Sequence, residues 1–584
     1  MTEPPTAFDR REHDVAATRT RSGPREITAH RRPRRTDRRP RQPPVRPEAD
    51  GAPADRAPRV RRPETADIVA PVPVASGKWL IAVSVMLGTI LEVLDTSIVN
   101  VALPHMQGAF SAGIDEITWV LTSYLVANGI VIPMTGWLSS VFGRKRYFIT
   151  SITLFTIASM FCGAAPDLRT MVFCRVLQGL AGAAMLPSSQ AILMETFPPS
   201  EQPIAMATWG VGLMVAPVIG PTLGGWITDT YSWRWCFYIN LPFGILAALM
   251  CARFLQEPAY LTRQRTRPDW LGITLLVVGL GTAQMVLDRG ERADWFEAPW
   301  VWAFTAASIL ALTSFVVWEL FTDEPVVKLR LLRDRGFAVG CGLIGFLAFI
   351  LFGSLALWPL YLQELMGYSA AQSGWASAPR GCATGLSMFF VGRLARRFDP
   401  RLLMGFGVAL LVAGQLQMSH FYLQLGWWQI VAPSILQGTG LGFIFTLLST
   451  TALSRVPREQ MSNAASIYNL MRNMGASFGI AILGTLLVRR GQFHQAVLAT
   501  WSTPFYAPFR HALEGIPGAM AARGAVVGST QAAGLLYEQL RAQATMLAFD
   551  DTFFAVGLIA LGIFVGLFLL PRPRPAEGGV PAAH

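Results

Sequence analysis

Residues 91–100 read Leu91-Glu92-Val93-Leu94-Asp95-Thr96-Ser97-Ile98-Val99-Asn100, inside an apolar stretch that begins near Trp79 and is long enough to cross a bilayer. The two carboxylates stand three residues apart, so a helix presents them on one face. At ~1.5 Å of rise per residue they lie roughly 20–24 Å along the helix from Trp79, past the middle of the membrane. Ionisable groups at that depth are costly, so we expect Glu92 and Asp95 to take up protons from one side and release them to the other. The alternative is a pair satisfied by hydrogen bonds between helices.

The rest of the chain repeats this apolar character. Of its 584 residues, 52% are hydrophobic and only 15% are charged, whereas soluble proteins are about a quarter charged. This composition excludes a soluble multidomain enzyme and a disordered chain, and apolar runs of ~20 residues exclude a β-barrel. We expect an all-α polytopic membrane protein with fourteen spans, which start near Trp79, Thr118, Tyr147, Met171, Met206, Cys236, Leu271, Pro299, Phe337, Gln372, Leu402, Trp427, Asn463 and Asp551. The charged run Asp288–Arg292 leaves the seventh and eighth open: two spans, or one span and a re-entrant piece.

The net charge of +12 has two sources. Residues 1–77 carry 17 Arg and 11 acids, a surplus of +6, and are too poor in apolar residues to fold. We expect a disordered, Arg/Pro-rich cytoplasmic tail, either a solvated spacer or a segment attracted to anionic lipid or nucleic acid. The other source is the loops, because clusters such as Arg144–Arg146 and Arg393–Arg397 fall on one side of the predicted membrane. Positive loops face the cytoplasm, which predicts that both termini are cytoplasmic.

The sequence contains an internal repeat. Residues 136–144 resemble residues 392–399 at a separation of about 256, and Leu177-Gln178-Gly179 is repeated 259 residues later as Leu436-Gln437-Gly438. The near-constant spacing predicts two related six-helix bundles with spans seven and eight inserted between them, and chance matching of short strings is the alternative. Parallel repeats of this kind are a transporter architecture with the binding cavity at their interface.

Three arginines also lie at membrane depth. Arg175 in the fourth span needs a carboxylate or backbone carbonyls as a partner, and an arginine whose partner changes with conformation can trigger proton release. Arg380 and Arg472 are secondary candidates, for which structural pairing is as good an explanation. Asn100 and Gln178 are secondary candidates as well.

Glycine and proline are dense in the fifth span. Residues 216–225, here called the glycine-proline segment, contain Pro217, Gly220, Pro221, Gly224 and Gly225. Small residues let helices approach closely and proline bends them, so this segment predicts a tight contact that seals one side of a cavity.

Other chemistries find no support in the sequence. The single Gly-Lys dipeptide, Gly77-Lys78, lacks the first glycine of a phosphate-binding loop, and no HExxH motif occurs. The six cysteines have no paired spacing, which argues against disulfides and metal ligation. We therefore expect a protein that is not an enzyme and that has neither a metal nor a cofactor.

Five segments resemble one family in the same order. Residues 94–104 look like the first-span signature of the fourteen-span drug:proton antiporters of the major facilitator superfamily. Residues 136–146, here called the loop segment, resemble the superfamily's cytoplasmic loop motif through Gly136, Gly143, Arg144 and Lys145. Arg175–Gly179, the glycine-proline segment and Trp233–Pro242 resemble its fourth-span, antiporter and Trp-Arg-Trp segments. One departure is Ser140, where the loop motif usually carries an acid, so the usual charge-helix latch is in doubt.

The resemblance covers roughly residues 78–570 and is to the EmrB/QacA type, with EmrB-like multidrug efflux pumps most similar. It implies proton-driven export (antiport) of hydrophobic or amphipathic drugs across the bacterial inner membrane, with Asp95 and Arg175 in proton coupling. It also implies a periplasmic membrane-fusion adaptor and an outer-membrane channel as partners. The outer segment 491–550 is long for a transporter loop. Within it, Leu536, Leu540, Ala544 and Leu547 form one stripe, which fits an adaptor or the membrane surface.

The predicted organisation follows. Residues 1–77 form the tail, 78–255 the N-terminal bundle, 256–336 a cytoplasmic linker with two inserted spans, 337–570 the C-terminal bundle, and 571–584 a second cytoplasmic tail. The predicted function is proton-coupled multidrug efflux by alternating access. A dedicated exporter of one metabolite, lipid or siderophore is the alternative within transport, and a non-transporting receptor or scaffold is the alternative from another class.

Overall fold

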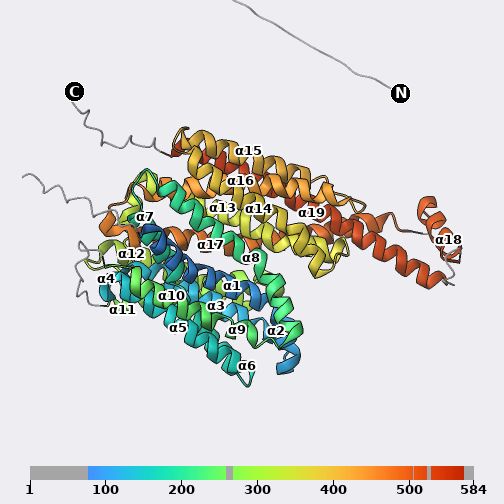
Figure 1. Cartoon of the computed structure of the whole chain (residues 1–584). Coiled ribbons are helices and arrows are strands. Elements are labelled where there is room, and N and C mark those ends of the chain that lie inside the picture. The colour runs from blue at the N-terminus through green and yellow to red at the C-terminus, as the bar shows by residue number, and fades with distance from the viewer. Residues whose placement is uncertain (1–76, 258–267, 504, 522–527, 571–584) are drawn as a thin grey trace, which may run out of the picture. The chain divides into compact units, whose positions relative to one another are not determined.

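The computed structural model describes residues 77–257, 268–503, 505–521 and 528–570. These residues form helices joined by turns, with no strand among them (Figure 1). The predicted tails and Arg263, Arg265 and Arg267 lie outside the described residues.

The N-terminal half contains six membrane-spanning segments, three of which consist of more than one helical piece. Its helices are α1 (Lys78–Phe110), α2 (Ile114–Ile117), α3 (Trp119–Val131), α4 (Thr135–Phe142), α5 (Arg144–Ala164), α6 (Leu168–Gly182), α7 (Met185–Thr196), α8 (Gln202–Thr230), α9 (Trp235–Tyr238) and α10 (Asn240–Phe254). A short 3-10 turn around Pro133 joins α3 to α4, because proline removes a backbone donor inside a span.

Two separate helices follow, α11 (Trp270–Arg289) and α12 (Pro299–Phe321). Both are long and apolar enough to cross a membrane. The charged residues 288–292 lie at the end of α11 and in the turn after it. The seventh and eighth spans are therefore two helices rather than one helix and a re-entrant piece.

The C-terminal half contains the remaining helices. They are α13 (Arg335–Leu360), α14 (Ala370–Leu394), α15 (Pro400–Met418), α16 (Trp427–Leu453), α17 (Met461–Thr500), α18 (Ala507–Ala521) and α19 (Ser529–Leu569). The segment 491–550 differs from a loop: it consists of the end of α17, α18 and the first half of α19. Helix α18 packs against α19 beyond the ends of the other helices (Figure 1).

Each of the fourteen predicted spans corresponds to a helix at the expected place. Thirteen of them, within the described residues, are long and apolar enough to cross a membrane. The tenth predicted span, near Gln372, is α14, which has 25 residues but is not among the thirteen. At ~1.5 Å per residue α14 is nevertheless long enough to span a bilayer.

The two halves repeat the same packing scheme. In the N-terminal half α1 packs against α8 and α10, and α6 against α3 and α5; in the C-terminal half α13 packs against α17 and α19, and α16 against α14 and α15. A Cβ added to Gly179 would lie 2.4 Å from the carbonyl oxygen of Tyr124, and one added to Gly438 would lie 2.4 Å from that of Arg380. The repeat in the sequence therefore corresponds to a repeat in space.

The bundles contact each other near the end that carries the loop segment. Gly392 of α14 packs on Ile204 and Ala207 of α8, and the rings of Trp209 and Phe445 stack 6.0 Å apart. Farther along the same face of α8, Val215 and Ile219 are exposed. The bundles thus meet at one end of α8 and separate along the rest of it.

Candidate functional site

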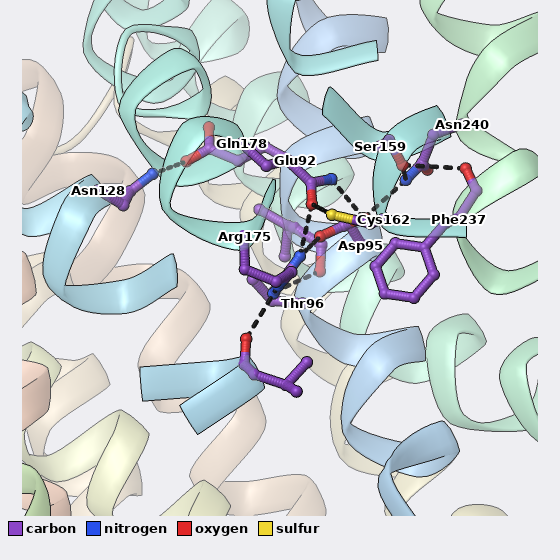
Figure 2. A network of polar contacts seen from close by, with 12 residues as sticks. Glu92, Asp95, Thr96, Asn128, Ser159, Cys162, Arg175, Gln178, Phe237 and Asn240 are labelled. Carbon is purple, nitrogen blue, oxygen red and sulfur yellow. Dashed lines mark hydrogen bonds and ion pairs between the residues drawn. The ribbon is translucent and has the colours of Figure 1, made fainter. Parts of the chain in front are cut away.

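A buried ion pair lies at the centre of the N-terminal bundle. Arg175 of α6 donates from Nη1 to Oδ2 of Asp95 on α1 at 2.6 Å, and both side chains have no exposed surface (Figure 2). A charge-assisted bond in a dry environment is much stronger than the same pair at the surface. The two residues that the sequence selected separately therefore form one site.

Three polar side chains complete the site around the carboxylate. Gln178 and Asn240 donate to Oδ1 of Asp95 at 2.9 and 2.7 Å (Figure 2). Asn240 also donates to Ser159 at 2.9 Å, and the Ser159 hydroxyl donates to the carbonyl of Phe237. Both carboxylate oxygens are satisfied, so Asp95 is held in one orientation.

Arg175 has further partners that do not depend on Asp95. Its Nε donates to the carbonyl of Val120 at 2.9 Å and its Nη1 to Oε1 of Gln178 at 2.8 Å. Its guanidinium carbon also lies 4.2 Å from the ring centroid of Tyr124. The guanidinium can therefore stay in place when the charge on Asp95 changes.

Glu92 has different surroundings from Asp95. It is buried, Asn128 of α3 donates to its Oε1 at 3.0 Å, and its Oε2 has no hydrogen-bond partner. Its charge interacts with Arg472 of α17, in the other bundle. The two acids share a helix face, but Asp95 belongs to the N-terminal bundle and Glu92 to the boundary between bundles.

The glycine-proline segment packs α8 on α1 beside Asp95. A Cβ on Gly220 would lie 2.4 Å from Oγ of Ser97, and a Cβ on Gly224 would lie 3.1 Å from the carbonyl of Ile98. Pro217 and Pro221 lie inside the same helix. The close contact expected from these residues is present, although Gly225 meets only one atom at 3.9 Å.

The loop segment contacts both bundles. A Cβ on Gly136 would lie 2.6 Å from Cα of Asn463 on α17. Gly143 has φ +86°, a conformation that glycine adopts most easily, and the carboxylate of Glu257 accepts from the next two backbone amides.

The side chains of the loop segment supply a different ion pair from the expected latch. Arg144 is buried and pairs with Glu195 of α7, and Lys145 donates to the carbonyl of Ala252. Ser140, which replaces the usual acid, donates to the carbonyl of Trp137. Arg144 thus binds an acid of the fourth span instead of one in the loop.

The secondary candidates are scattered. Gln178 belongs to the Asp95 site, whereas Asn100 is exposed. Arg472 lies at the bundle boundary, and Arg380 is buried in α14 of the C-terminal bundle. Among the described residues no cluster of His, Cys, Asp and Glu could hold a metal ion.

Sequence reasoning missed Asn240, Ser159, Asn128 and Tyr124 as partners. Asn240 lies within the Trp-Arg-Trp segment, and an asparagine inside an apolar run is a usable signal because an unpaired amide in lipid is costly. Ser159 and Tyr124 carry no such signal, since serine and tyrosine are common in spans.

Comparisons with known proteins identify the family of the chain. Residues 85–480 match the family model described as Major Facilitator Superfamily. The chain is 34% identical to the Escherichia coli K12 protein "Multidrug export protein EmrB" over 86% of this chain and 98% of that one. It is also 34% identical to the Neisseria gonorrhoeae "Fatty acid resistance protein FarB", over 87% and 99%.

Solved structures show the same fold. The proton:xylose symporter XylE, at 12% identity, superposes with a TM-score of 0.55 over 85% of this chain and 96% of that one. The matched family model, the relatives and the paired bundles lead to one conclusion: the chain belongs to the major facilitator superfamily and is a relative of the EmrB-type export proteins.

Proposed function

We propose that this protein exports hydrophobic or amphipathic drugs and toxic compounds across the bacterial inner membrane in exchange for protons. The names of its relatives support multidrug export. The observation that carries the coupling is the carboxylate of Asp95, buried and bound by Arg175 and two amides. No cofactor is needed, because the proton gradient supplies the energy.

The mechanism follows from the partners of the ion pair. Protonation removes the charge of Asp95 and weakens its bond to Arg175, which keeps Val120, Gln178 and Tyr124 as partners. Asp95 lies two and three residues before Ser97 and Ile98, the residues of α1 against which α8 packs. A change at Asp95 therefore alters the α1–α8 contact, and α8 is one of the helices that meet the other bundle.

The positive loops support one orientation of this cycle. By the positive-inside rule, the loop segment and both termini face the cytoplasm in this proposal. Because the bundles meet at the loop-segment end and separate elsewhere along α8, the structure is then an outward-open state.

The coupling role is tested with Asp95→Asn, which keeps the size of the side chain and removes its charge. We expect pH-gradient-driven ethidium efflux from vesicles to be lost, while ethidium binding to the purified variant remains. Asp115→Asn, at an exposed aspartate, is the matched control. Unimpaired gradient-driven efflux by Asp95→Asn contradicts the proposed coupling.

The protruding end of α17 and α19 suits a periplasmic adaptor of the membrane-fusion class, itself joined to an outer-membrane channel. Phe493, Val497 and Trp501 are exposed and follow one face of the end of α17. Replacing residues 502–527 by a short Gly-Ser linker keeps both long helices. We expect it to reduce co-purification of the adaptor without changing transport in proteoliposomes. Undiminished co-purification of the adaptor would exclude α18 and its flanks as the docking site.

A further inference from the structure

Each bundle holds one buried arginine beside a glycine contact. Tyr124 and Arg380 occupy matching places, since Gly179 packs on the carbonyl of Tyr124 and Gly438 on that of Arg380. In the N-terminal bundle the guanidinium comes from Arg175 and lies over the ring of Tyr124. In the C-terminal bundle the guanidinium comes from Arg380 itself.

The C-terminal bundle lacks the matching carboxylate. Ser354 stands 259 positions after Asp95 and Gln437 stands 259 positions after Gln178. Gln415 donates to Ser354 at 3.2 Å, so the hydroxyl at the repeat position of Asp95 is bound by a neutral amide. Both amide atoms of the buried Gln437 lack a hydrogen-bond partner. The repeat therefore preserves a polar centre but not the negative charge.

Arg380 has no compensating acid within the described residues. Its side chain is 6% exposed, its Nη2 has no hydrogen-bond partner, and no described carboxylate forms an ion pair with it. A buried guanidinium without an anion is strongly unfavourable, and in a membrane protein it marks a functional site.

Arg380 lies near the place where the bundles separate. A Cβ added to Gly385 of α14 would lie 3.9 Å from the side chain of Val211 on α8, and the two helices run antiparallel. One and two turns farther along that face of α8, Val215 and Ile219 are exposed. Because the helices are antiparallel, the same direction along α14 leads to Gly381 and Ser377, which stand on either side of Arg380 in the sequence. A ligand in the cleft between the bundles can therefore reach the turn that carries Arg380.

Of the two acids on α1, only Asp95 forms an ion pair with an arginine within the described residues. In the C-terminal bundle Arg380 and Arg472 are both buried without an ion pair among the described residues. Arg472 has the acid Glu92 as an electrostatic neighbour, whereas Arg380 has no described acid beside it.

We propose that Arg380 binds the anionic group of the exported compound, so that the preferred substrates are amphipathic anions such as carboxylates. The inference rests on the proposed export function and adds a specificity-determining residue and a substrate class to it. A guanidinium pairs with a carboxylate through two parallel hydrogen bonds. A ligand that carries a cation or a neutral amide in place of the carboxylate cannot form this pair.

The test uses three dansyl probes that share one alkyl chain and differ in its end group. They are a carboxylate (11-(dansylamino)undecanoate), the corresponding primary amide and a trimethylammonium analogue. Binding to the full-length protein in detergent is followed by dansyl fluorescence, and pH-driven transport is followed in proteoliposomes. The variants are Arg380→Gln, Arg380→Lys and, as the matched control, Arg397→Gln at an exposed arginine just beyond α14.

We expect Arg380→Gln to weaken carboxylate binding about tenfold or more while amide binding stays unchanged. Arg380→Lys should retain part of the carboxylate preference, and Arg397→Gln all of it. The inference is overturned if Arg380→Gln keeps the wild-type ratio of carboxylate to amide binding. Equal loss of all three probes also overturns it, because that is a structural defect. Carboxylate binding that depends on Arg380 without any gradient-driven transport would support the site and contradict the proposed function.

Discussion

Asn240 shows how a single neutral side chain can fix a buried charge. Its amide donates to both Asp95 and Ser159, so it links α10 to α1 and α5 at the ion pair. Hydrogen bonds to buried charged groups contribute more to stability than bonds between neutral groups, because no water can take the place of a lost donor.

Replacing Asn240 by Ala should lower the free energy of unfolding by about 1–3 kcal/mol, since one donor to a buried carboxylate is lost. Asn240→Asp should lower the free energy of unfolding further, because it places a second carboxylate beside Asp95. Thermal unfolding of the purified variants and pH-driven efflux measure both effects. Asn100→Asp, on an exposed residue of α1, is the control. Equal stability of Asn240→Asp and wild type would show that the bond contributes nothing.

At this scale the sequence identified the charges and one neutral partner, Gln178, but not Asn240, Ser159 or Tyr124. A carboxylate or guanidinium in an apolar run is conspicuous because of its cost, and Asp95 and Arg175 were found for that reason. Serine and tyrosine at membrane depth cost little free energy, so they occur there without a functional role. Which of them faces a charge depends on helix rotation, which the sequence of one helix does not determine.

The inserted helix α11 and the turn after it bridge the two bundles, whereas α12 packs on α11. Toward α3, the Thr122 hydroxyl donates to Asp288, and Arg289 lies 4.2 Å from the ring centroid of Trp119. Toward α17, Ser477 donates to Gln284 at 3.0 Å, and the Trp295 indole donates to Thr485 just beyond α11. When the bundles move relative to each other, α11 can follow only one of them.

We expect α11 to follow the N-terminal bundle, because its packing against α3 is the more extensive. Cysteines at Gln284 and Ser477, joined by a short bifunctional methanethiosulfonate, should then block transport reversibly. The same cross-link between Thr122 and Asp288 should leave transport intact. The measurement is efflux before and after reduction, and the opposite pattern would assign α11 to the C-terminal bundle.

The elements themselves were largely predictable. Apolar length identified every span. The charged turn between α11 and α12 left open only whether this region forms two spans or one span and a re-entrant piece. The segment 491–550 was predicted as a loop with one amphipathic helix. Two of its parts continue α17 and α19 without a break, because nothing in the sequence ends a helix where it leaves the membrane.

At the scale of the molecule, the contact between bundles defines which end is closed. Ala207 is buried under Gly392 at the closed end, whereas Ile219, three turns along the same helix, is exposed. This difference gives a direct test of the outward-open state and of the orientation in the membrane.

A cysteine at Ile219 should react with a membrane-impermeant maleimide added to intact cells, and a cysteine at Ala207 should not. The background carries Cys382→Ser, because Cys382 alone among the six cysteines is exposed. Labelling is read by gel shift. Reaction of the Ile219 cysteine only in inverted vesicles would place the open end in the cytoplasm and reverse the orientation.

The weak apolarity of α14 has a consequence for how the protein is made. A centrally placed arginine raises the cost of inserting a helix by about 2.5–3.5 kcal/mol, and α14 brings no acid to offset it. Its packing partner α16 leaves the ribosome about 60 residues, or roughly 3 to 12 s, later. We therefore expect α14 to wait beside the translocon until α16 arrives. The C-terminal bundle is then the half that membrane quality-control proteases reach first when synthesis stalls.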